Sequence, residues 1–237
     1  MVNRRVSRKI RSFVIGNTLV KAYYDWDWRE AEKEFRLALD LNPGDADVRH
    51  DYAHFLLAMN RLEESVAESK RAMELNPYDD ILVACVGWHC YYAHRYDETI
   101  EYCLKALAMN PKDDMAHSMI GRAYEQESKT KEAIAALKKG DDTVSLAHLY
   151  AVTGDRKQAE EVLAKLYENR KKGYSSAYDI AVIHQGLGNK DQAFGWLEKA
   201  FEERAPDLLH INGDPRLSDL HSDPRYRNLI KRIGLPA

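Results

Sequence analysis

The sequence predicts an all-α fold in which one pair of helices is repeated along the chain, and three observations support it. An Asn-Pro pair recurs with a constant step of 34 residues, ending at Pro43, Pro77 and Pro111. Small residues recur with the same step. Only 7 prolines and 12 glycines interrupt the 237 residues, so long helices are permitted over most of the chain.

Each Asn-Pro pair ends the second helix of a unit, in the segments AEKEFRLALDLNP, SVAESKRAMELNP and TIEYCLKALAMNP. Proline disfavours helical geometry at the residue before it and has no amide hydrogen for the helical hydrogen-bond ladder. An aspartate follows each pair, at Asp45, at Asp79 or Asp80, and at Asp113, where the next helix needs an N-cap. The pattern therefore predicts a helix, a short polar turn, a second helix and Asn-Pro in each unit.

The recurring small residues predict where two helices cross closely. Steps of 34 residues link Ala31, Ser65, Thr99 and Ala133, and also Ala38, Ala72 and Ala106. A methyl or hydroxyl side chain lets two helix axes approach to about 8–10 Å. We therefore expect a close helix crossing at each of these positions.

The predicted number of units is six, with the fifth shortened. After Ala133 the next comparable small residue is Ala159, only 26 residues on, and Ala193 restores the step of 34. The eight missing residues fall around residues 138–142. We therefore expect a short leading helix over residues 143–152 in the fifth unit.

The period breaks after Phe201, and the remaining residues are typical of a cap. Asp214-Pro215 and Asp223-Pro224 each place an N-cap before a proline at the first helical position, which predicts two short helices. The second helix carries one apolar stripe, formed by Tyr226, Leu229, Ile230 and Ile233. A solenoid exposes the apolar face of its last repeat, so we expect this helix to cover that face.

These features resemble the tetratricopeptide repeats of bacterial proteins, whose period is 34 residues. The resemblance runs from about Asn17 to Pro236, with YYDWDWREAEKEFRLALDLNP near its start and YDIAVIHQGLGNKDQAFGWLEKAFEERAPDL, then DPRLSDLHSDPRYRNLIKRIGLP, near its end. It implies a right-handed superhelix (an α-solenoid) of about six helix-turn-helix repeats with C-terminal capping helices. We expect a single domain over residues 1–237, with a basic segment at 1–11, repeats at 12–205 and a cap at 206–237.

The resemblance also implies where a ligand binds, because leading helices line a concave groove in this family. Positions one helical turn apart along these helices select the candidate binding residues His50, His54, Trp88, Tyr91, Tyr92, Ser118, Arg122 and Glu125. Aromatic rings beside histidine and arginine suit a peptide with apolar and acidic side chains. The alternative is that some of these aromatic residues pack between neighbouring repeats.

His50 and His54 raise a second possibility, since their i, i+4 spacing lets both imidazoles face one way and hold a metal. Asp47 lies one turn earlier and offers a carboxylate. No glutamate follows the first histidine, so the pair lacks the HExxH pattern of zinc proteases, and the sequence places no third protein ligand on another helix. We therefore expect ordinary groove histidines and neither a bound metal nor a cofactor.

Catalytic motifs are absent from the sequence. It contains no G-x-S-x-G, and no serine, histidine and aspartate set lies on a recognisable scaffold. Cys85, Cys90 and Cys103 lack metal-ligand spacing and are expected to be reduced, buried thiols. We expect a protein that is not an enzyme.

Charge and hydropathy limit the other partners. A net charge of −3 argues against a general nucleic-acid binder, which gains affinity from a basic excess. No stretch approaches the roughly 18 apolar residues of a membrane span. The basic residues 1–11 are followed by no apolar core of signal-peptide type. Together with reduced thiols, these features favour a cytoplasmic location.

The leading functional hypothesis is therefore a scaffold or adaptor that binds a partner protein or peptide in the concave groove. The alternative is a regulatory module of a larger signalling protein, since similar repeat regions follow adenylate-cyclase-like, winged-helix or protein-kinase domains. A metal-binding role ranks third. A clamp for chaperone tails is not expected, because His54, Trp88 and Arg122 stand where such clamps carry lysine and asparagine. Self-association through the ends or grooves of the array stays open.

Overall fold

The computed structural model describes residue 18, residues 20–173 and residues 175–236. The basic segment predicted at 1–11 lies outside these residues. Every regular element in the described ranges is a helix: η1 (Lys21–Asp25), α2 (Trp28–Leu41), α3 (Ala46–Ala58), α4 (Leu62–Leu75), α5 (Asp80–Tyr92), α6 (Tyr96–Met109), α7 (Asp114–Gln126), α8 (Thr130–Lys139), α9 (Thr143–Val152), α10 (Arg156–Lys171), α11 (Ala177–Gly186), α12 (Lys190–Glu202), η2 (Pro206–His210), η3 (Pro215–Leu220) and α13 (Pro224–Ile233). The predicted all-α fold is confirmed.

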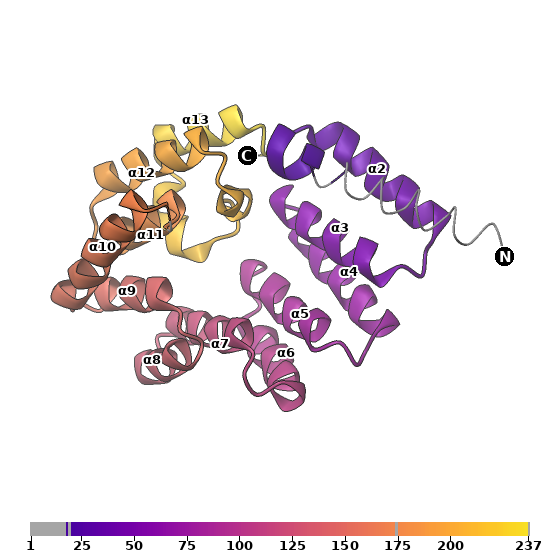
Figure 1. The fold of residues 1–237 in the computed structure, drawn as a ribbon, viewed down its shortest axis with the longest axis horizontal. Coiled ribbons are helices and arrows are strands. Elements are labelled where there is room, and N and C mark those ends of the chain that lie inside the picture. Colours follow the sequence, from indigo (N-terminus) through magenta and orange to yellow (C-terminus); the bar gives the residue numbers. More distant parts are fainter. Residues whose placement is uncertain (1–17, 19, 174, 237) are drawn as a thin grey trace.

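Pairs of consecutive helices make up the array, from η1 with α2 to α11 with α12. The leading helices contact one another in succession, α3 with α5, α5 with α7, α7 with α9 and α9 with α11. Second helices contact the leading helix that follows them, as α4 contacts α5. Figure 1 shows the resulting superhelix, which curves with its leading helices on the inside. The described chain therefore forms the predicted solenoid of six helix pairs.

The helix boundaries follow the predicted signals. The side chains of Asp45, Asp79 and Asp113 accept hydrogen bonds from first-turn amides of α3, α5 and α7. The second helices α2, α4 and α6 end at Leu41, Leu75 and Met109, directly before the asparagine of each Asn-Pro pair. Local residue chemistry at the caps therefore sets the period of the array.

The turn inside each pair also repeats. One residue per turn adopts a left-handed conformation, namely Trp26, Asn60, His94, Ser128, Gly154 and Gly188, with φ between 54° and 91°. The first four are 34 residues apart, and so are the last two. A single left-handed residue thus reverses the chain at the same place in every pair.

The shortening in the middle of the array falls on two consecutive helices and the turn between them. The leading helix α9 is short, as expected, with 10 residues against 13 in α7. The preceding second helix α8 also has only 10 residues, against 14 in α6. Three of the eight missing residues thus come from α9 and four from α8, and one more comes from the connecting turn. The predicted short leading helix over residues 143–152 is therefore confirmed, and the structure adds that α8 is shortened as well.

The small recurring residues lie at close helix crossings, as predicted. Ala31, Ser65, Thr99 and Ala133 are all 0% exposed. Gly121 shows how near the helices come, because a β-carbon on it would lie 2.5 Å from Cγ of Leu137. The packing between α7 and α8 therefore leaves no room for a side chain at this position.

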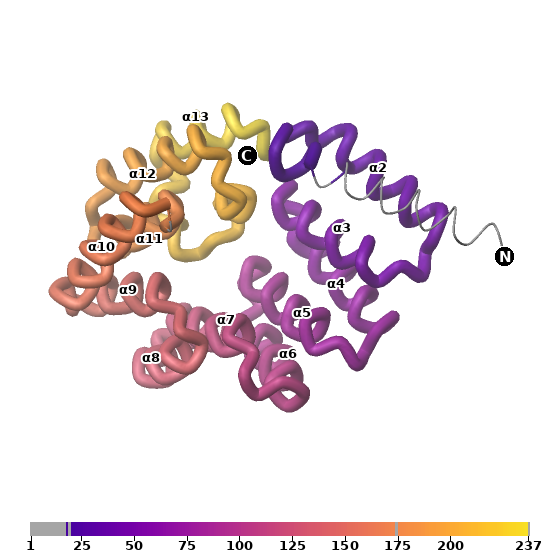
Figure 2. Tube along the Cα trace, viewed as in Figure 1, coloured from indigo at the N-terminus to yellow at the C-terminus, as the bar shows by residue number. Residues whose placement is uncertain are grey.

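The C-terminal residues do more than cap the last repeat. Asp214 and Asp223 cap η3 and α13 as predicted, and α13 packs on α12. Before reaching α13, however, residues 206–222 turn back into the concave side, where η2 contacts α3 and η3 contacts α11. We call residues 206–222 the returning segment. Figure 2 shows that the trace then ends beside α2, so the curved array is nearly closed.

Candidate functional site

The concave face carries an aromatic cluster on α5, the leading helix of the third pair. Ring centroids of Trp88 lie 4.6 Å from Tyr92 and 4.7 Å from His54. Trp88 is half-buried and Tyr92 is buried. Tyr91 is fully buried and packs against Tyr92 and Tyr96. Tyr91 therefore offers no exposed ring to the groove, and its ring contacts lie within the third helix pair.

The returning segment lies directly against these rings. Its His210 ring is 4.8 Å from Trp88 and 5.4 Å from Tyr92, measured between centroids. A β-carbon on Gly213 would lie 3.4 Å from the Tyr92 side chain, so the backbone itself covers that ring. Five apolar side chains, each at most 2% exposed, anchor the segment: Leu208, Leu209, Ile211, Leu217 and Leu220. The concave groove is therefore partly filled by the chain itself.

A buried ion pair fixes the returning segment in place. Arg216 donates to both carboxylate oxygens of Asp214, at 2.9 and 2.6 Å, and to the hydroxyl of Ser145 on α9 at 3.1 Å. Tyr178 on α11 donates its hydroxyl to Asp214 at 3.0 Å. Burial alone would raise the pKa of Asp214, but Arg216 outweighs burial and holds the pKa below its ordinary value. Asp214 stays ionised, and the segment is tied to two leading helices.

The guanidinium of Arg122 on α7 is already paired with a carboxylate of the array. Its Nε and Nη2 atoms donate to Oδ2 of Asp142 at 3.0 and 2.8 Å. Burial works against ionisation of this carboxyl, yet Arg122 lowers the pKa of Asp142 to about 2. The expectation of a peptide with apolar and acidic side chains was based on aromatic rings beside histidine and arginine, and this pairing removes the arginine part of that basis.

Glu125 and Ser118 are engaged within the array. Glu125 lies 2.6 Å from Nδ1 of His148, whose Nε2 lies 3.1 Å from Oε1 of Gln185. The Glu125 side chain is only 4% exposed, so it links α7 to α9 and offers little surface to a ligand in the groove. Ser118 is buried, and its hydroxyl donates to the carbonyl oxygen of Gly140 at 3.4 Å.

His50 and His54 lie on α3, beside the aromatic cluster of α5. Their ring centroids are 4.6 Å apart, and the His54 ring also lies 4.6 Å from that of His89. Both side chains are half-buried. The three cysteines are buried and unpaired, as predicted, and Cys85 lies near these two histidines.

A pocket remains open between α5, α7 and the returning segment. Its volume is about 380 Å³, within the usual range of small-ligand sites. It is lined by Trp88, Tyr92, Met115, Ser118, Met119, Arg122, Gly140, Asp142, Asp207 and His210. The structure thus brings four predicted binding residues together here (Trp88, Tyr92, Ser118 and Arg122), whereas His50, His54, Tyr91 and Glu125 lie elsewhere.

The charge of this pocket is negative. Its acidic residues are Asp142 and Asp207, and Asp142 is neutralised by Arg122. Burial lowers the pKa of His210 to about 4, so this ring is neutral at pH 7. Asp207 accepts a hydrogen bond from the Ser176 hydroxyl at 3.3 Å and has no ion-pair partner among the described residues. Asp207 is therefore the uncompensated charge of the pocket.

Asp207 and His210 are absent from the predicted binding set. The reason is that an end cap would leave the returning segment far from the groove, whereas the structure places this segment inside it. Neither residue carries a local motif that marks a site.

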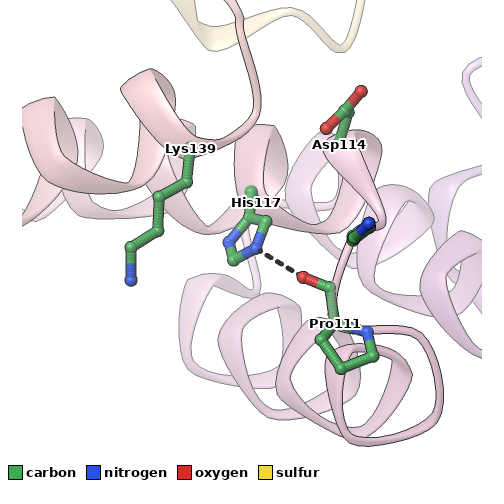
Figure 3. A pocket seen from close by; sticks show the side chains of 5 residues that line it. Pro111, Asp114, His117 and Lys139 are labelled. Carbon is green, nitrogen blue, oxygen red and sulfur yellow. Dashed lines mark hydrogen bonds between the residues drawn. The ribbon is translucent and has the colours of Figure 1, made fainter.

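A second hollow, of about 650 Å³, lies at the junction of the α6–α7 turn with the end of α8. It is lined by Pro111, Lys112, Asp114, His117 and Lys139. Nε2 of His117 lies 3.2 Å from the carbonyl oxygen of Pro111. Figure 3 shows the Asp114 carboxylate and the Lys139 ammonium pointing away from each other. These groups do not converge on a common ligand position.

Tetratricopeptide-repeat family models match residues 26–83 and 87–142. The chain is also similar to the solved structure of PilW, described as a widely conserved type IV pilus biogenesis factor, with 17% identity, 93% of this chain and 98% of that chain covered, and a TM-score of 0.61. It is similar to pilF of Pseudomonas aeruginosa, with 16% identity, coverage of 95% and 99%, and a TM-score of 0.53. No curated protein matches the chain. At these identities the solved structures support the superhelical fold alone.

No helix among the described residues is both long and apolar enough to cross a membrane.

Proposed function

We propose that this chain, which contains tetratricopeptide repeats, is a protein-interaction module that holds a basic side chain of a partner protein in the pocket between α5, α7 and the returning segment. The observation that carries the proposal is the uncompensated carboxylate of Asp207 in a pocket walled by the rings of Trp88 and Tyr92. The proposal assigns binding to this site and no catalytic step.

The lining suits a lysine or arginine side chain along its whole length. Met115 and Met119 offer adaptable apolar contacts for the aliphatic stem. The faces of aromatic rings attract a cation, by about 0.5–2 kcal/mol according to the degree of desolvation. A charge-assisted hydrogen bond to Asp207 then fixes the end of the side chain.

The wider electrostatics favour the same partner. Burial, with a further contribution from Asp207, raises the pKa of Asp179 on α11 to about 6. Asp207 and Asp142 both raise the pKa of Asp179, whereas Arg216 and Arg122 supply the positive charge that opposes them. The carboxylates outnumber the guanidinium groups, so a partner cation relieves repulsion that an acidic partner would increase.

The test is affinity capture with the full chain, in wild-type and Asp207→Lys forms, followed by mass spectrometry. A partner that depends on the pocket is recovered by the wild type and lost with Asp207→Lys. Binding of the purified partner is then measured by calorimetry, and replacing its contacting lysine or arginine by alanine should weaken binding by about tenfold or more, equivalent to about 1.4 kcal/mol.

Asp219→Lys is the matched control, because it makes the same charge change on an exposed residue of the same returning segment. Asp219 does not line the pocket. Equal recovery by all three proteins would remove Asp207 from the interaction, and a partner segment without basic residues would contradict the proposed chemistry.

The alternative of a regulatory module in a larger signalling protein stays a prediction, as do a cytoplasmic location and self-association. The coding sequence upstream of Met1 tests the first, since a cyclase, kinase or winged-helix domain in frame would support it. Light scattering of the purified chain tests the last.

A further inference from the structure

We propose that His50, His54 and Cys85 form a zinc-binding site on the concave side of the second and third helix pairs. Each residue offers one ligand atom, and these atoms all lie within 4.8 Å of one another. The site adjoins the pocket proposed to bind a partner, because the His54 ring lies 4.7 Å from Trp88, but it shares no residue with that pocket and its test reads out metal binding alone.

The repeat architecture explains why these three side chains meet. His50 and His54 are one helical turn apart on α3, so they share one face of that helix. The leading helices α3 and α5 pack directly on each other, and Cys85 lies on α5. The sequence offers only the histidine pair, because the third ligand comes from another helix. Asp47, the carboxylate that the sequence suggests, is not in this group.

An unsatisfied buried nitrogen supports the assignment. Nδ1 of His50 is buried and has no hydrogen-bond partner. The neighbouring His89 is 0% exposed and also has a free Nε2, although its Nδ1 lies 2.7 Å from the Ser65 hydroxyl. Buried polar atoms ordinarily have partners, and a bound cation supplies one to His50.

The donor set selects the metal. Two imidazole nitrogens and one thiolate suit zinc, whereas magnesium and calcium prefer oxygen ligands. Ligand atoms around a tetrahedral zinc lie roughly 3.5 Å from one another. Small side-chain rotations that move the three ligand atoms together by about 1 Å therefore complete the site. Binding exchanges the Cys85 S–H bond for a zinc–sulfur bond and releases one proton to solvent. Water takes the fourth position, as in zinc sites with three protein ligands.

The experiment is a cobalt titration of the reduced, untagged full chain, followed by displacement with zinc. Cobalt replaces zinc in such sites and gives a near-ultraviolet charge-transfer band when a thiolate is a ligand. We expect this band in the wild type and its loss on adding zinc. Cys85→Ser should abolish the band, and His54→Gln should weaken zinc binding by more than about tenfold.

Cys103→Ser is the matched control, since Cys103 is an equally buried cysteine on α6 outside the group. Its band should equal that of the wild type. Circular dichroism verifies that each variant is folded, and His50→Gln, at a half-buried position, provides a further test if Cys85→Ser unfolds. The proposal is overturned if wild-type protein gives no thiolate band, or if the band persists in folded Cys85→Ser protein.

Discussion

The indole Nε1 of Trp28 donates a hydrogen bond of 3.1 Å to the carbonyl oxygen of Ile233, which lies 205 residues later in the chain. Trp28 opens α2, and Ile233 ends α13. The two ends of the array are therefore joined directly. This contact, together with the returning segment, turns an open solenoid into a nearly closed one with a small central pocket.

Removing this contact should destabilise the whole chain. Trp28→Ala loses the hydrogen bond and the packing of a half-buried indole, so we expect the free energy of unfolding to fall by about 2–3 kcal/mol. Trp28→Phe keeps most of the packing and should cost about 1 kcal/mol. Urea denaturation followed by circular dichroism measures both changes, and an unchanged midpoint for Trp28→Ala would mean that the ends do not meet.

Two glycine-to-alanine substitutions should change the stability of the chain in opposite directions. Gly121→Ala puts a methyl group 2.5 Å from Cγ of Leu137, and overpacking of this kind costs about 1–3 kcal/mol. Gly195 lies exposed in α12 with nothing within 4 Å of the added carbon, so Gly195→Ala should stabilise the chain by about 0.5–1 kcal/mol. Thermal denaturation gives the order of the midpoints, and a stabilising Gly121→Ala would contradict the close crossing of α7 and α8.

The buried ion pair of the returning segment should matter far more than an exposed one. Asp214→Asn leaves the buried guanidinium of Arg216 without its charged partner, which should cost about 3–5 kcal/mol. Asp191→Asn removes one of the two carboxylate partners of the exposed Arg225 and should cost less than about 1 kcal/mol. Chemical denaturation at pH 7 compares the two, and similar losses would show that Asp214 is open to solvent.

Asp179 should make the protein less stable as the pH rises. Its pKa is about 6 in the folded chain and about 3.9 when unfolded, so the folded state binds the proton more tightly. The stability that this group contributes is complete below about pH 4 and is lost as the pH rises through 6. Asp179→Asn cannot lose a proton, so its stability relative to wild type should improve by roughly 2 kcal/mol between pH 4 and pH 7. Denaturation across this range measures the difference, and a constant difference would exclude the raised pKa.

The repeat and its boundaries are predictable from the sequence because they depend on local chemistry. Asp45 caps a helix and Pro43 prevents one from continuing, whatever the rest of the chain does. The distribution of the shortening between α8 and α9 is not predictable in this way, since it depends on how two helices of reduced length pack together.

One feature of the sequence indicates that the concave face of α5 is covered by another segment. The segment DILVACVGWHCYY, which forms α5, is apolar on nearly every side, and a helix of this kind is buried all round. A groove-lining helix should instead expose one polar face. The burial of Tyr91 follows from this pattern, but the identity of the covering segment does not, because Asp214 and Arg216 meet α9 and α11 only after the chain has folded.

Hydrogen–deuterium exchange of the full chain tests most directly whether the returning segment fills the concave face and so defines the pocket. The amides of Ile211 and Leu217 donate hydrogen bonds to carbonyl oxygens within the segment, and both side chains are buried. We predict that peptides covering residues 206–222 exchange as slowly as those from α5 and α7. Exchange within seconds across 206–222, with α5 still protected, would show a segment that is not docked and would contradict the account.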